Sequence, residues 1–322
     1  MTSEYESAAA VTVRAPAKVN LQLAVGPARP DGFHALVTVY HAVSLFDEVT
    51  VSPSTRTSIK VRGEDAATVP ADHTNLAWQA ALALAAAAGL ADRDAAVHID
   101  IRKRIPAAAG LAGGSADAAA TLVACNELWR TGLTGAELAE IGARLGSDVP
   151  FTLAGGTAVG RGRGEELTTA LVSGAYHWAL AFSHTGLSTP EVYATCDRLR
   201  AARAADTSES GPSIEPQLST ALMTALRSGD ATAVGPQLSN DLQPAALSLQ
   251  PDLRRTLAAG REFGALGAIV SGSGPTCAFL AKSAAHAGEI AVSLTGAGVC
   301  RAVARASGPA PGAAVLRQDA MS

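Results

Sequence analysis

The run of small residues from Pro106 to Asp117 is the segment best suited to hold an anion; it reads Pro-Ala-Ala-Ala-Gly-Leu-Ala-Gly-Gly-Ser-Ala-Asp. Small side chains let a ligand approach the backbone closely, and the free N–H groups that open a helix, here expected at Ser115, attract negative charge. The run has neither the Gly-Lys-[Ser/Thr] ending of a Walker A loop nor a Gly-x-Gly-x-x-Gly pattern. Phosphate is the expected ligand, although a tight strand-to-helix turn would have the same composition.

Two charged residues, Lys18 and Asp148, could take part in acid–base chemistry. Lys18 falls within a strand pattern, on the face opposite Val19 and Leu21, where a lysine is usually exposed to solvent. Asp148 follows the end of an expected helix, where a carboxylate either caps a turn or acts as a base at the rim of a cleft. The residues alone leave the alternatives open at both positions.

Two further segments could contact a ligand. His34, after Phe33, is either a buried, hydrogen-bonded histidine or a group that recognises a base. The turn 272–274, Gly-Ser-Gly, is either a bulge or a close approach of backbone to ligand. Because the other histidines are dispersed along the chain, a metal cluster is not expected.

The composition indicates a globular protein, and the length is sufficient for about two domains. Of 322 residues, 48% are apolar and only 4% are aromatic, so Ala, Val and Leu must fill the core. A net charge of −4 provides no footprint for nucleic acid or an anionic membrane. The four cysteines follow neither zinc nor disulfide spacing, the first ten residues do not resemble a signal peptide, and the apolar segment 77–91 is short for a membrane span. We therefore expect a cytoplasmic protein.

Hydrophobic periodicity predicts the elements that must position these residues. Alternation predicts strands at 11–25, 36–43, 48–51, 58–61, 97–101, 179–182, 268–271 and 276–280. The helical period predicts helices at 75–89, after Ser115, and at 135–145, 216–227, 231–238 and 251–263. The small and polar segment 201–216 predicts a mobile loop, and the tail 308–322 is expected to be disordered.

Three motifs resemble those of the GHMP small-molecule kinases, in the same order and spacing: Ala-Pro-Ala-Lys-Val-Asn-Leu at 15–21, Pro-x-x-x-Gly-Leu-x-Gly-Gly-Ser at 106–115, and Ser-Gly-Ser-Gly-Pro at 271–275. Further segments resemble the branch of that family that acts on a cytidine-diphosphate-linked polyol. They are Arg-Pro-Asp-Gly-Phe-His at 29–34, Lys-Arg-Ile-Pro at 103–106, Gly-Ser-Asp-Val-Pro-Phe at 146–151 and Asn-Asp-Leu-Gln-Pro at 240–244. The resemblance runs from about Val11 to Ala281 and favours functional roles for Lys18, Asp148 and the loop.

The resemblance implies an α+β protein with the two-domain GHMP kinase fold and an active site in the interdomain cleft. The N-terminal domain would be like domain 2 of ribosomal protein S5, and the C-terminal domain would be ferredoxin-like. The expected boundaries are a flexible tail at 1–10, an N-terminal domain at 11–170, a C-terminal domain at 171–307 and a disordered tail at 308–322.

The implied activity is ATP-dependent phosphorylation of the 2-hydroxyl of a cytidine-diphosphate-linked methylerythritol in the non-mevalonate isoprenoid pathway. Asp148 would be the general base and Lys18 would stabilise both its charge and the developing oxyanion. The residues implied to bind ATP are Lys103, Pro106, Ala107, Ala108, Ala109, Gly110, Leu111, Ala112, Gly113, Gly114, Ser115 and Ala116. Fixed backbone dipoles of that loop would meet the charge on the transferring phosphoryl group.

The resemblance also assigns the organic substrate. Phe33 and Tyr193 would stack on the cytosine ring and His34 would read its edge, because a flat apolar slot accepts any ring and only polar groups select among them. The residues implied to contact the rest of the substrate are Asn20, Asn75 and Thr189.

The sequence departs from the family pattern in two places. Four alanines, at 107, 108, 109 and 112, occupy positions where glycine is usual, and methyl groups limit positive φ and close approach. Phe33 replaces the usual tyrosine but keeps a stacking face. Mg²⁺ is expected for phosphoryl transfer, with Ser115 as the candidate ligand and Asp117 as a weaker one.

Three rival functions are a kinase for another alcohol, a non-catalytic nucleotide sensor and a dinucleotide oxidoreductase. Phe33, His34 and Asp148 argue against the first, and the presence of both Lys18 and Asp148 argues against the second. No acidic residue stands at the distance after the loop that a dinucleotide site requires. We expect a monomer or weak homodimer that binds small molecules and neither nucleic acid nor membrane.

Overall fold

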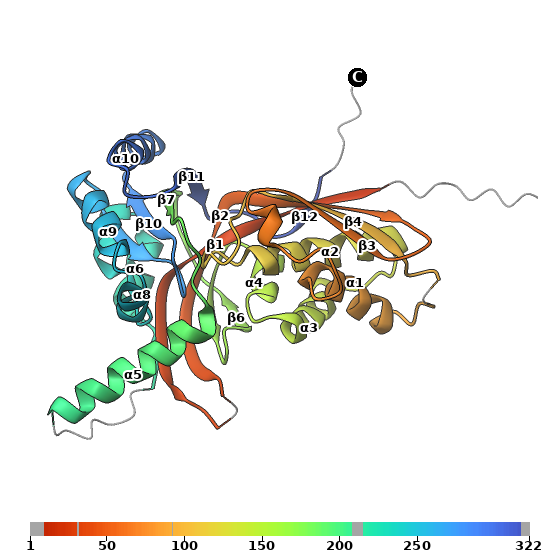
Figure 1. Cartoon of the computed structure of the whole chain (residues 1–322), viewed down its shortest axis with the longest axis horizontal. Coiled ribbons are helices and arrows are strands. Elements are labelled where there is room, and N and C mark those ends of the chain that lie inside the picture. The colour runs from red at the N-terminus through yellow and green to blue at the C-terminus, as the bar shows by residue number, and fades with distance from the viewer. Residues whose placement is uncertain (1–9, 31, 92, 208–214, 317–322) are drawn as a thin grey trace, which may run out of the picture.

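Two β-sheets organise the chain, one in each of two lobes (Figure 1). The structure, a computed structural model, describes residues 10–30, 32–91, 93–207 and 215–316. The first nine residues, expected to form a tail, lie outside this part of the chain. Both lobes combine sheet and helices, which confirms the predicted α+β class.

The sheet of the N-terminal lobe has eight strands within the described residues, in the order β12-β1-β2-β4-β3. Strand β5 extends from β2, β6 pairs with β5, and β8 pairs with β1. The strand bounds are Val11–Ala28 (β1), His34–Pro53 (β2), Ser58–Gly63 (β3), Val97–Lys103 (β4), Thr157–Arg161 (β5), Glu166–Thr169 (β6), Ser239–Asn240 (β8) and Ala314–Val315 (β12).

The prediction of two short strands at 36–43 and 48–51 is wrong, because β2 runs through the gap. In its pairing with β1, Phe46 lies opposite Pro16 and Val43 lies opposite Ala17, so the two residues of β2 between them have no counterpart in β1. The extra residues bulge where Pro16 has no N–H to give to the ladder. The bulge lets one long strand continue from the sheet toward the cleft.

Helices cover one face of this sheet (Figure 1). Helix α2 packs on β1, β2 and α1, and its buried surface consists largely of alanine, which allows close approach to the strands. Thr134 and Glu137 form a capping box that begins α3. The bounds are Leu76–Ala87 (α1), Gly113–Trp129 (α2), Gly135–Leu145 (α3) and Val149–Ala154 (α4), with a 3₁₀ turn at Ala66–Thr68 (η1). Helix α2 thus begins two residues before the predicted start at Ser115.

The C-terminal lobe is built on a four-stranded antiparallel sheet in the order β11-β7-β10-β9. These strands span Tyr176–Phe182 (β7), Gly267–Val270 (β9), Cys277–Ala281 (β10) and Ala302–Gly308 (β11). The helices are Thr189–Thr207 (α5), Thr220–Ser228 (α6), Ala231–Val234 (α7), Gln243–Leu249 (α8), Leu253–Glu262 (α9) and Ala284–Gly296 (α10), with a 3₁₀ turn at Gly235–Gln237 (η2). The helix predicted at 216–227 starts instead at Thr220, where the Ser219 side chain caps it.

Two segments predicted to lack structure are partly ordered. Helix α5 continues through 201–207 of the predicted loop, and residues 208–214 lie outside the described chain. The tail returns to the N-terminal sheet, where Ala314 and Val315 pair with Arg14 and Val13 as strand β12. Composition alone suggested disorder at 308–322, but an open edge of β1 was available for pairing; residues 317–322 are not described.

His41 of β2 lies where the two lobes meet. Its ring is buried edge-on to Tyr176 and against Trp178 of β7, and its Nδ1 is 2.8 Å from Thr157 Oγ1. A Cβ on Gly308 of β11 would lie 2.3 Å from Nε2, so only glycine lets the strands approach this closely. The interface therefore encloses a neutral histidine, and burial lowers the pKa of His41 to about 3.

This burial predicts acid sensitivity. Because the folded pKa of His41 lies below the unfolded value, the unfolded state takes up a proton first as pH falls. The contribution of His41 to the free energy of unfolding is complete above about pH 6.5. As the pH falls from there toward about 3, this contribution is lost at about 1.4 kcal/mol per pH unit. Urea unfolding of His41→Asn between about pH 6.5 and pH 4.5 should show a slope shallower by that amount. The exposed variant His73→Asn should keep the wild-type slope, and equal slopes in all three proteins would contradict the argument.

Candidate active site

Lys18 of β1 is buried rather than exposed, which is unusual for a lysine on a strand. Its Nζ donates to Asn20 Oδ1 at 2.7 Å and to the Gly110 carbonyl oxygen at 3.0 Å, and lies 3.7 Å from Asp148 Oδ2. Asn20 is held in turn by a bond from its Nδ2 to Thr38 Oγ1. The buried ammonium is thus held by three oxygen atoms.

Asp148 precedes α4 but makes no side-chain cap bond, so the capping alternative does not describe it. Its Oδ1 accepts a hydrogen bond of 2.8 Å from the Tyr40 hydroxyl of β2, and its Oδ2 faces Lys18. Burial, and then the Asp148 carboxylate, raise the pKa of Tyr40, so this hydroxyl stays protonated and donates. Asp148 keeps about a quarter of its side chain accessible, at 28%. The Asp148 carboxyl group is therefore open to a cavity and has two donors, Lys18 and Tyr40, behind it.

Gly110 is the point at which the three sequence motifs meet. Its carbonyl oxygen accepts from Lys18 Nζ and from Ser271 Oγ. A Cβ at this position would lie 2.2 Å from the Ser271 carbonyl oxygen, and φ is +75°, so only glycine fits. Ala108 and Ala112 also take positive φ, at 48° and 61°, so the loop follows a left-handed path despite its methyl groups.

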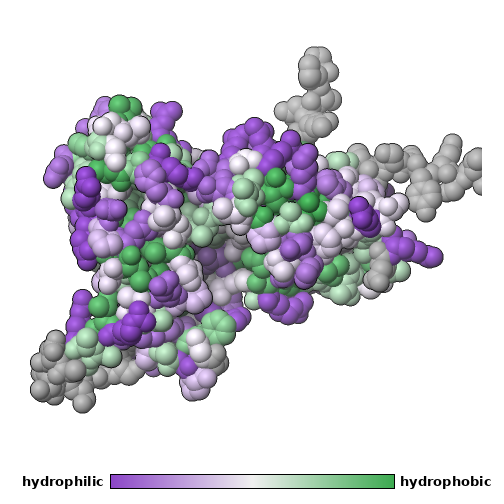
Figure 2. Space-filling model, in the orientation of Figure 1, coloured by the Kyte–Doolittle hydropathy of each residue, from purple (hydrophilic) through white to green (hydrophobic). Residues whose placement is uncertain are grey.

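Two cavities open on either side of this loop, where the surface is hollowed between the lobes (Figure 2). The first, of about 720 Å³, contains Lys18 and Asp148; the second, of about 570 Å³, contains Lys103 and Arg301. Both sizes suit small organic ligands. The loop residues shared by both cavities are Ala108, Ala109 and Gly114. The start of α2, with its free N–H groups, therefore stands between two ligand-sized spaces.

The far end of the first cavity is aromatic. Phe33 is half-exposed with the Arg163 guanidinium 5.0 Å from its ring centre, and the His34 ring lies 4.9 Å from that of Tyr193 on α5. Burial raises the pKa of Tyr193, so it remains a neutral ring. Thr189, at the start of α5, bonds to Ser273. Planar ring faces and one histidine edge thus line the same cavity as Lys18 and Asp148.

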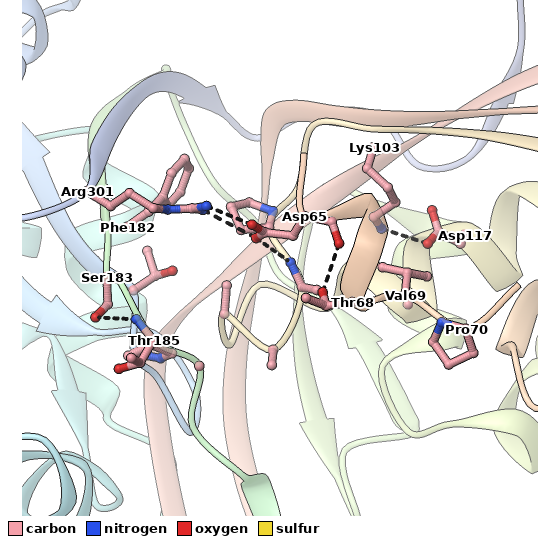
Figure 3. A pocket seen from close by; sticks show the side chains of 18 of the residues that line it. Asp65, Thr68, Val69, Pro70, Lys103, Asp117, Phe182, Ser183, Thr185 and Arg301 are labelled. Carbon is pink, nitrogen blue, oxygen red and sulfur yellow. Dashed lines mark hydrogen bonds and ion pairs between the residues drawn. The ribbon is translucent and has the colours of Figure 1, made fainter. Parts of the chain in front are cut away.

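A bridge between the lobes borders the second cavity (Figure 3). Arg301, immediately before β11, contacts Asp65 at 2.7 Å and Glu64 at 2.9 Å. Asp65 Oδ2 also accepts from the backbone N–H of Ala107, the second residue of the loop. The hydrogen bond from Arg301 to Asp65 raises the pKa of that guanidinium further. The bridge connects the C-terminal lobe to the entry of the phosphate loop.

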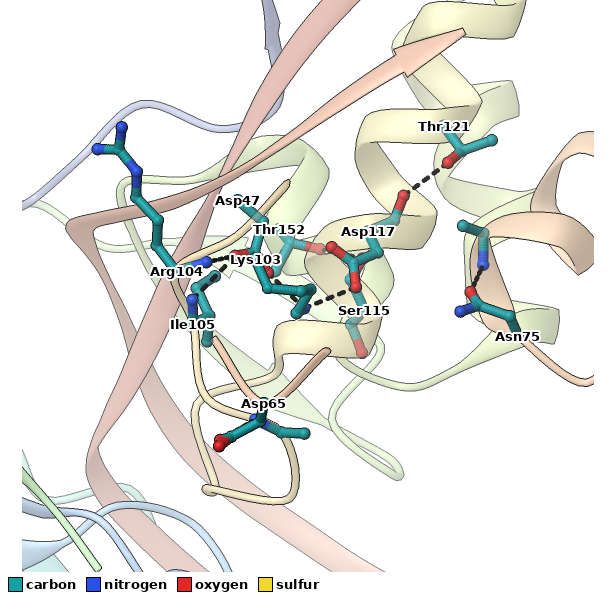
Figure 4. A network of polar contacts seen from close by, with 12 residues as sticks. Asp47, Asp65, Asn75, Lys103, Arg104, Ile105, Ser115, Asp117, Thr121 and Thr152 are labelled. Atoms are coloured by element: carbon teal, nitrogen blue, oxygen red, sulfur yellow. Dashed lines mark hydrogen bonds and ion pairs between the residues drawn. The ribbon is translucent and has the colours of Figure 1, made fainter. Parts of the chain in front are cut away.

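Lys103 belongs to a buried charge network beneath the start of α2 (Figure 4). Its Nζ donates to Asp47 at 2.5 Å and to Asp117 at 2.6 Å, while Asp47 Oδ1 accepts the N–H groups of Arg104 and Ile105. Burial would lower the pKa of Lys103, but the Asp117 and Asp47 carboxylates outweigh it and raise that pKa. Burial raises the pKa of Asp117, whose Oδ1 has no partner within the described chain. Lys103 lines the second cavity but is already committed to two carboxylates.

Most of the expected site residues lie in these cavities, and three do not fit the expectation. Asn75 lines the second cavity rather than the first, and its side chain caps α1 and bonds to Pro70. Leu111 and Ala116 are fully buried in the core and line neither cavity, because the loop turns inward there to begin α2. Tyr40 and Asp47 were not singled out from the sequence, although an aspartate after apolar residues in a strand is a usable signal for Asp47.

The two candidate metal ligands, Asp117 and Ser115, differ in whether their side-chain oxygen atoms already accept hydrogen bonds. Asp117 Oδ2 accepts from Lys103, so only the buried Oδ1 of this carboxylate is without a partner within the described chain. Ser115, half-buried in the first turn of α2, faces the first cavity and can offer a hydroxyl oxygen beside the oxygens of a bound phosphate. Within the described residues, no group of three or more His, Cys, Asp or Glu side chains could hold a metal ion. A Mg²⁺ ion at this point would be held by the Ser115 hydroxyl together with phosphate oxygens and water.

Comparison with known proteins agrees with this architecture. Residues 75–156 match the family model of the GHMP kinases N terminal domain, and residues 222–300 match that of the GHMP kinases C terminal domain. The fold is therefore that of a GHMP kinase, a class that uses ATP as phosphate donor. Within the described residues, no helix is long and apolar enough to cross a membrane.

Curated relatives define the family more narrowly. The 4-diphosphocytidyl-2-C-methyl-D-erythritol kinase of Mycolicibacterium smegmatis is 55% identical, over 98% of this chain and 95% of the relative. The kinase of the same name from Nocardia farcinica is 56% identical, over 95% of this chain and 96% of that relative. The chain belongs to the 4-diphosphocytidyl-2-C-methyl-D-erythritol kinase family.

Solved structures show the same fold. A crystal structure of 4-(cytidine 5'-diphospho)-2C-methyl-D-erythritol kinase has a TM-score of 0.72 and 33% identity, covering 92% of this chain and 98% of that chain. Homoserine kinase from Cytophaga hutchinsonii has a TM-score of 0.70 at 20% identity, covering 98% of this chain and 99% of that chain. The second likeness concerns the fold alone.

Proposed function

We propose that this protein transfers the γ-phosphoryl group of ATP to the 2-hydroxyl of 4-diphosphocytidyl-2-C-methyl-D-erythritol, giving the 2-phosphate and ADP. The observation that carries the proposal is the contact between Lys18 and Asp148 in the ring-lined cavity, beside a loop whose residues Ala108, Ala109 and Gly114 also line the second cavity. The relatives bear the name of this activity. The cytoplasmic location and the monomer or weak homodimer remain predictions.

The reaction needs a base, a stabilised oxyanion and a neutralised phosphoryl group. Asp148 would take the proton of the 2-hydroxyl, and the alkoxide oxygen would attack the γ-phosphorus as the bond to ADP breaks. Lys18 would keep Asp148 ionised and stabilise the oxygen as its charge develops. The α2 N-terminus and the N–H groups of the loop would hold the phosphates. Mg²⁺, held by Ser115 and the phosphate oxygens, would supply further charge neutralisation.

The two cavities receive the two substrates in this proposal. The ring-lined cavity would hold the cytidyl substrate, with Phe33 and Tyr193 against the cytosine faces and His34 at its edge. Asn20 and Thr189 would contact the remaining polyol and phosphates. The second cavity would hold the nucleoside of ATP beside Asn75 and Lys103. Phosphorus NMR tests the product: one new phosphomonoester with an intact cytidine diphosphate is expected, and free inorganic phosphate without that product would oppose the proposal.

Removing either aromatic ring should selectively weaken the binding of the cytidyl substrate. Phe33→Ala or Tyr193→Ala is expected to raise its KM about tenfold to a hundredfold, because stacking a base contributes ~1–3 kcal/mol. The KM for ATP should stay within about twofold, since both rings line the first cavity alone. Steady-state kinetics with each substrate varied in turn measures both constants. An unchanged KM for the cytidyl compound would place cytosine elsewhere.

Removing the bridge beside the second cavity should instead weaken the binding of ATP. Arg301→Ala breaks the contacts to Asp65 and Glu64 that hold the η1 turn beside the loop. Because these groups are partly exposed, we expect a modest rise in the KM for ATP, about threefold to tenfold, with the KM for the cytidyl substrate unchanged. Arg305→Ala, on the exposed side of β11, is the matched control. Equal KM values for ATP in both variants would contradict a role for the bridge.

A further inference from the structure

One stripe of helix α5 faces the ring-lined cavity. Thr189, Tyr193 and Asp197 are four residues apart, so they project from the same side of the helix. All three line the first cavity. Thr189 and Tyr193 are expected substrate contacts, whereas the resemblance gives no role to Asp197.

Asp197 is hydrogen-bonded to His34, and both residues belong to the wall of the first cavity. Both carboxylate oxygens of Asp197 lie 3.1 Å from His34 Nε2. The imidazole also contacts the Tyr193 ring, with the ring centres 4.9 Å apart and the planes tilted by 36°, and only 8% of the His34 side chain is exposed. The histidine ring is therefore held at two points by residues one helical turn apart.

This pairing decides which ring nitrogen carries the proton. An ionised carboxylate can only accept hydrogen bonds, so His34 must present N–H at Nε2. The nitrogen left for a ligand is Nδ1, and in the neutral ring it carries a lone pair. A lone pair attracts the exocyclic amino group of cytosine and repels the carbonyl oxygen that uracil has in its place.

We propose that Asp197 is a positioning residue that fixes the His34 tautomer and thereby makes the site select cytosine over uracil. The inference rests on the proposed function, because it concerns the same cavity. Asp197 itself is 39% exposed, so its effect lies in orienting the histidine rather than in contributing a strong ion pair. It acts through His34 and does not touch the base.

Binding of cytidine diphosphate and uridine diphosphate, measured by calorimetry, tests the inference. The wild-type protein should bind the cytidine compound more tightly. Asp197→Ala should lower the affinity for the cytidine compound about tenfold, the effect of losing one well-formed hydrogen bond. The affinity for the uridine compound should change less than about twofold. Asp197→Asn should retain most of the preference, because its amide oxygen still accepts from Nε2. Glu191→Ala, exposed on the same helix, is the matched control.

The outcomes separate the two claims. If the wild-type protein binds both diphosphates equally, the cytidyl site of the proposed function fails and the inference fails with it. If the wild type prefers cytidine and Asp197→Ala keeps the full preference, only the role of Asp197 is overturned. Nitrogen NMR gives an independent readout: the proton of His34 should sit on Nε2 in the wild type and distribute over both nitrogens in Asp197→Ala. An unchanged tautomer in that variant would also overturn the inference.

Discussion

Asp148→Asn is expected to lower kcat about a hundredfold to ten-thousandfold, the range that a positioned general base contributes. The amide keeps an oxygen that can accept from the Tyr40 hydroxyl, so the cavity should keep its shape. It has no basic oxygen for the substrate proton and no charge to pair with Lys18. The KM values for both substrates should change little, because the lost interaction develops during the reaction.

Steady-state kinetics and calorimetry of ATP binding measure the two sides of this expectation. Glu140→Gln, which removes a carboxylate from the exposed face of α3, is the matched control and should behave as wild type. A kcat for Asp148→Asn within about threefold of wild type would remove Asp148 as the base. Loss of ATP binding together with turnover would instead assign Asp148 a structural role.

Lys103→Met is expected to lower the free energy of unfolding by about 3–5 kcal/mol, the effect of leaving a buried charge without its partner. Both carboxylates of the network are buried, and Lys103 is their shared cation. Methionine fills a similar volume but cannot donate. The N-terminus of α2 should loosen as well, because Lys103 Nζ lies directly beneath Gly113, 3.2 Å from the position of an added Cβ.

Urea unfolding distinguishes this network from an ordinary surface lysine. Lys60→Met, on the exposed side of β3, should change the stability by less than about 0.5 kcal/mol. Asp117→Asn should cost less than Lys103→Met, because it removes one buried negative charge and leaves Lys103 paired with Asp47. A loss below about 1 kcal/mol in Lys103→Met would contradict the account of the network.

The parts of the site predictable from sequence are those in which chemistry depends on consecutive residues. The loop at 106–116 could be recognised because small residues before a helix have a local reason to bind an anion. The roles of Lys18 and Asp148, 130 positions apart, become clear only when the fold places strand β1 beside the start of α4. The motif resemblance supplied that information, since periodicity leaves both residues ambiguous.

The residues that sequence reasoning missed or misplaced depend on tertiary pairing. Tyr40 reaches Asp148 because β2 runs beside β1 into the cleft, and alternation alone gives no partner for its hydroxyl. Asn75 was assigned to the cytidyl substrate, yet α1 turns it toward the second cavity. The tail near Ala314 has the composition of a disordered segment, but a free sheet edge orders it. In each case the deciding neighbour lies far away in the chain.

The most direct test of the central claim is a coupled ADP-release assay with ATP, Mg²⁺ and 4-diphosphocytidyl-2-C-methyl-D-erythritol, run beside mevalonate, homoserine and galactose. We predict turnover with the cytidyl compound alone, because under the proposed function only that compound would engage both the aromatic end of the first cavity and Asp148. Turnover with another alcohol would contradict the assigned substrate. ATP binding without turnover of any of the four would contradict catalysis itself and favour a nucleotide-binding sensor.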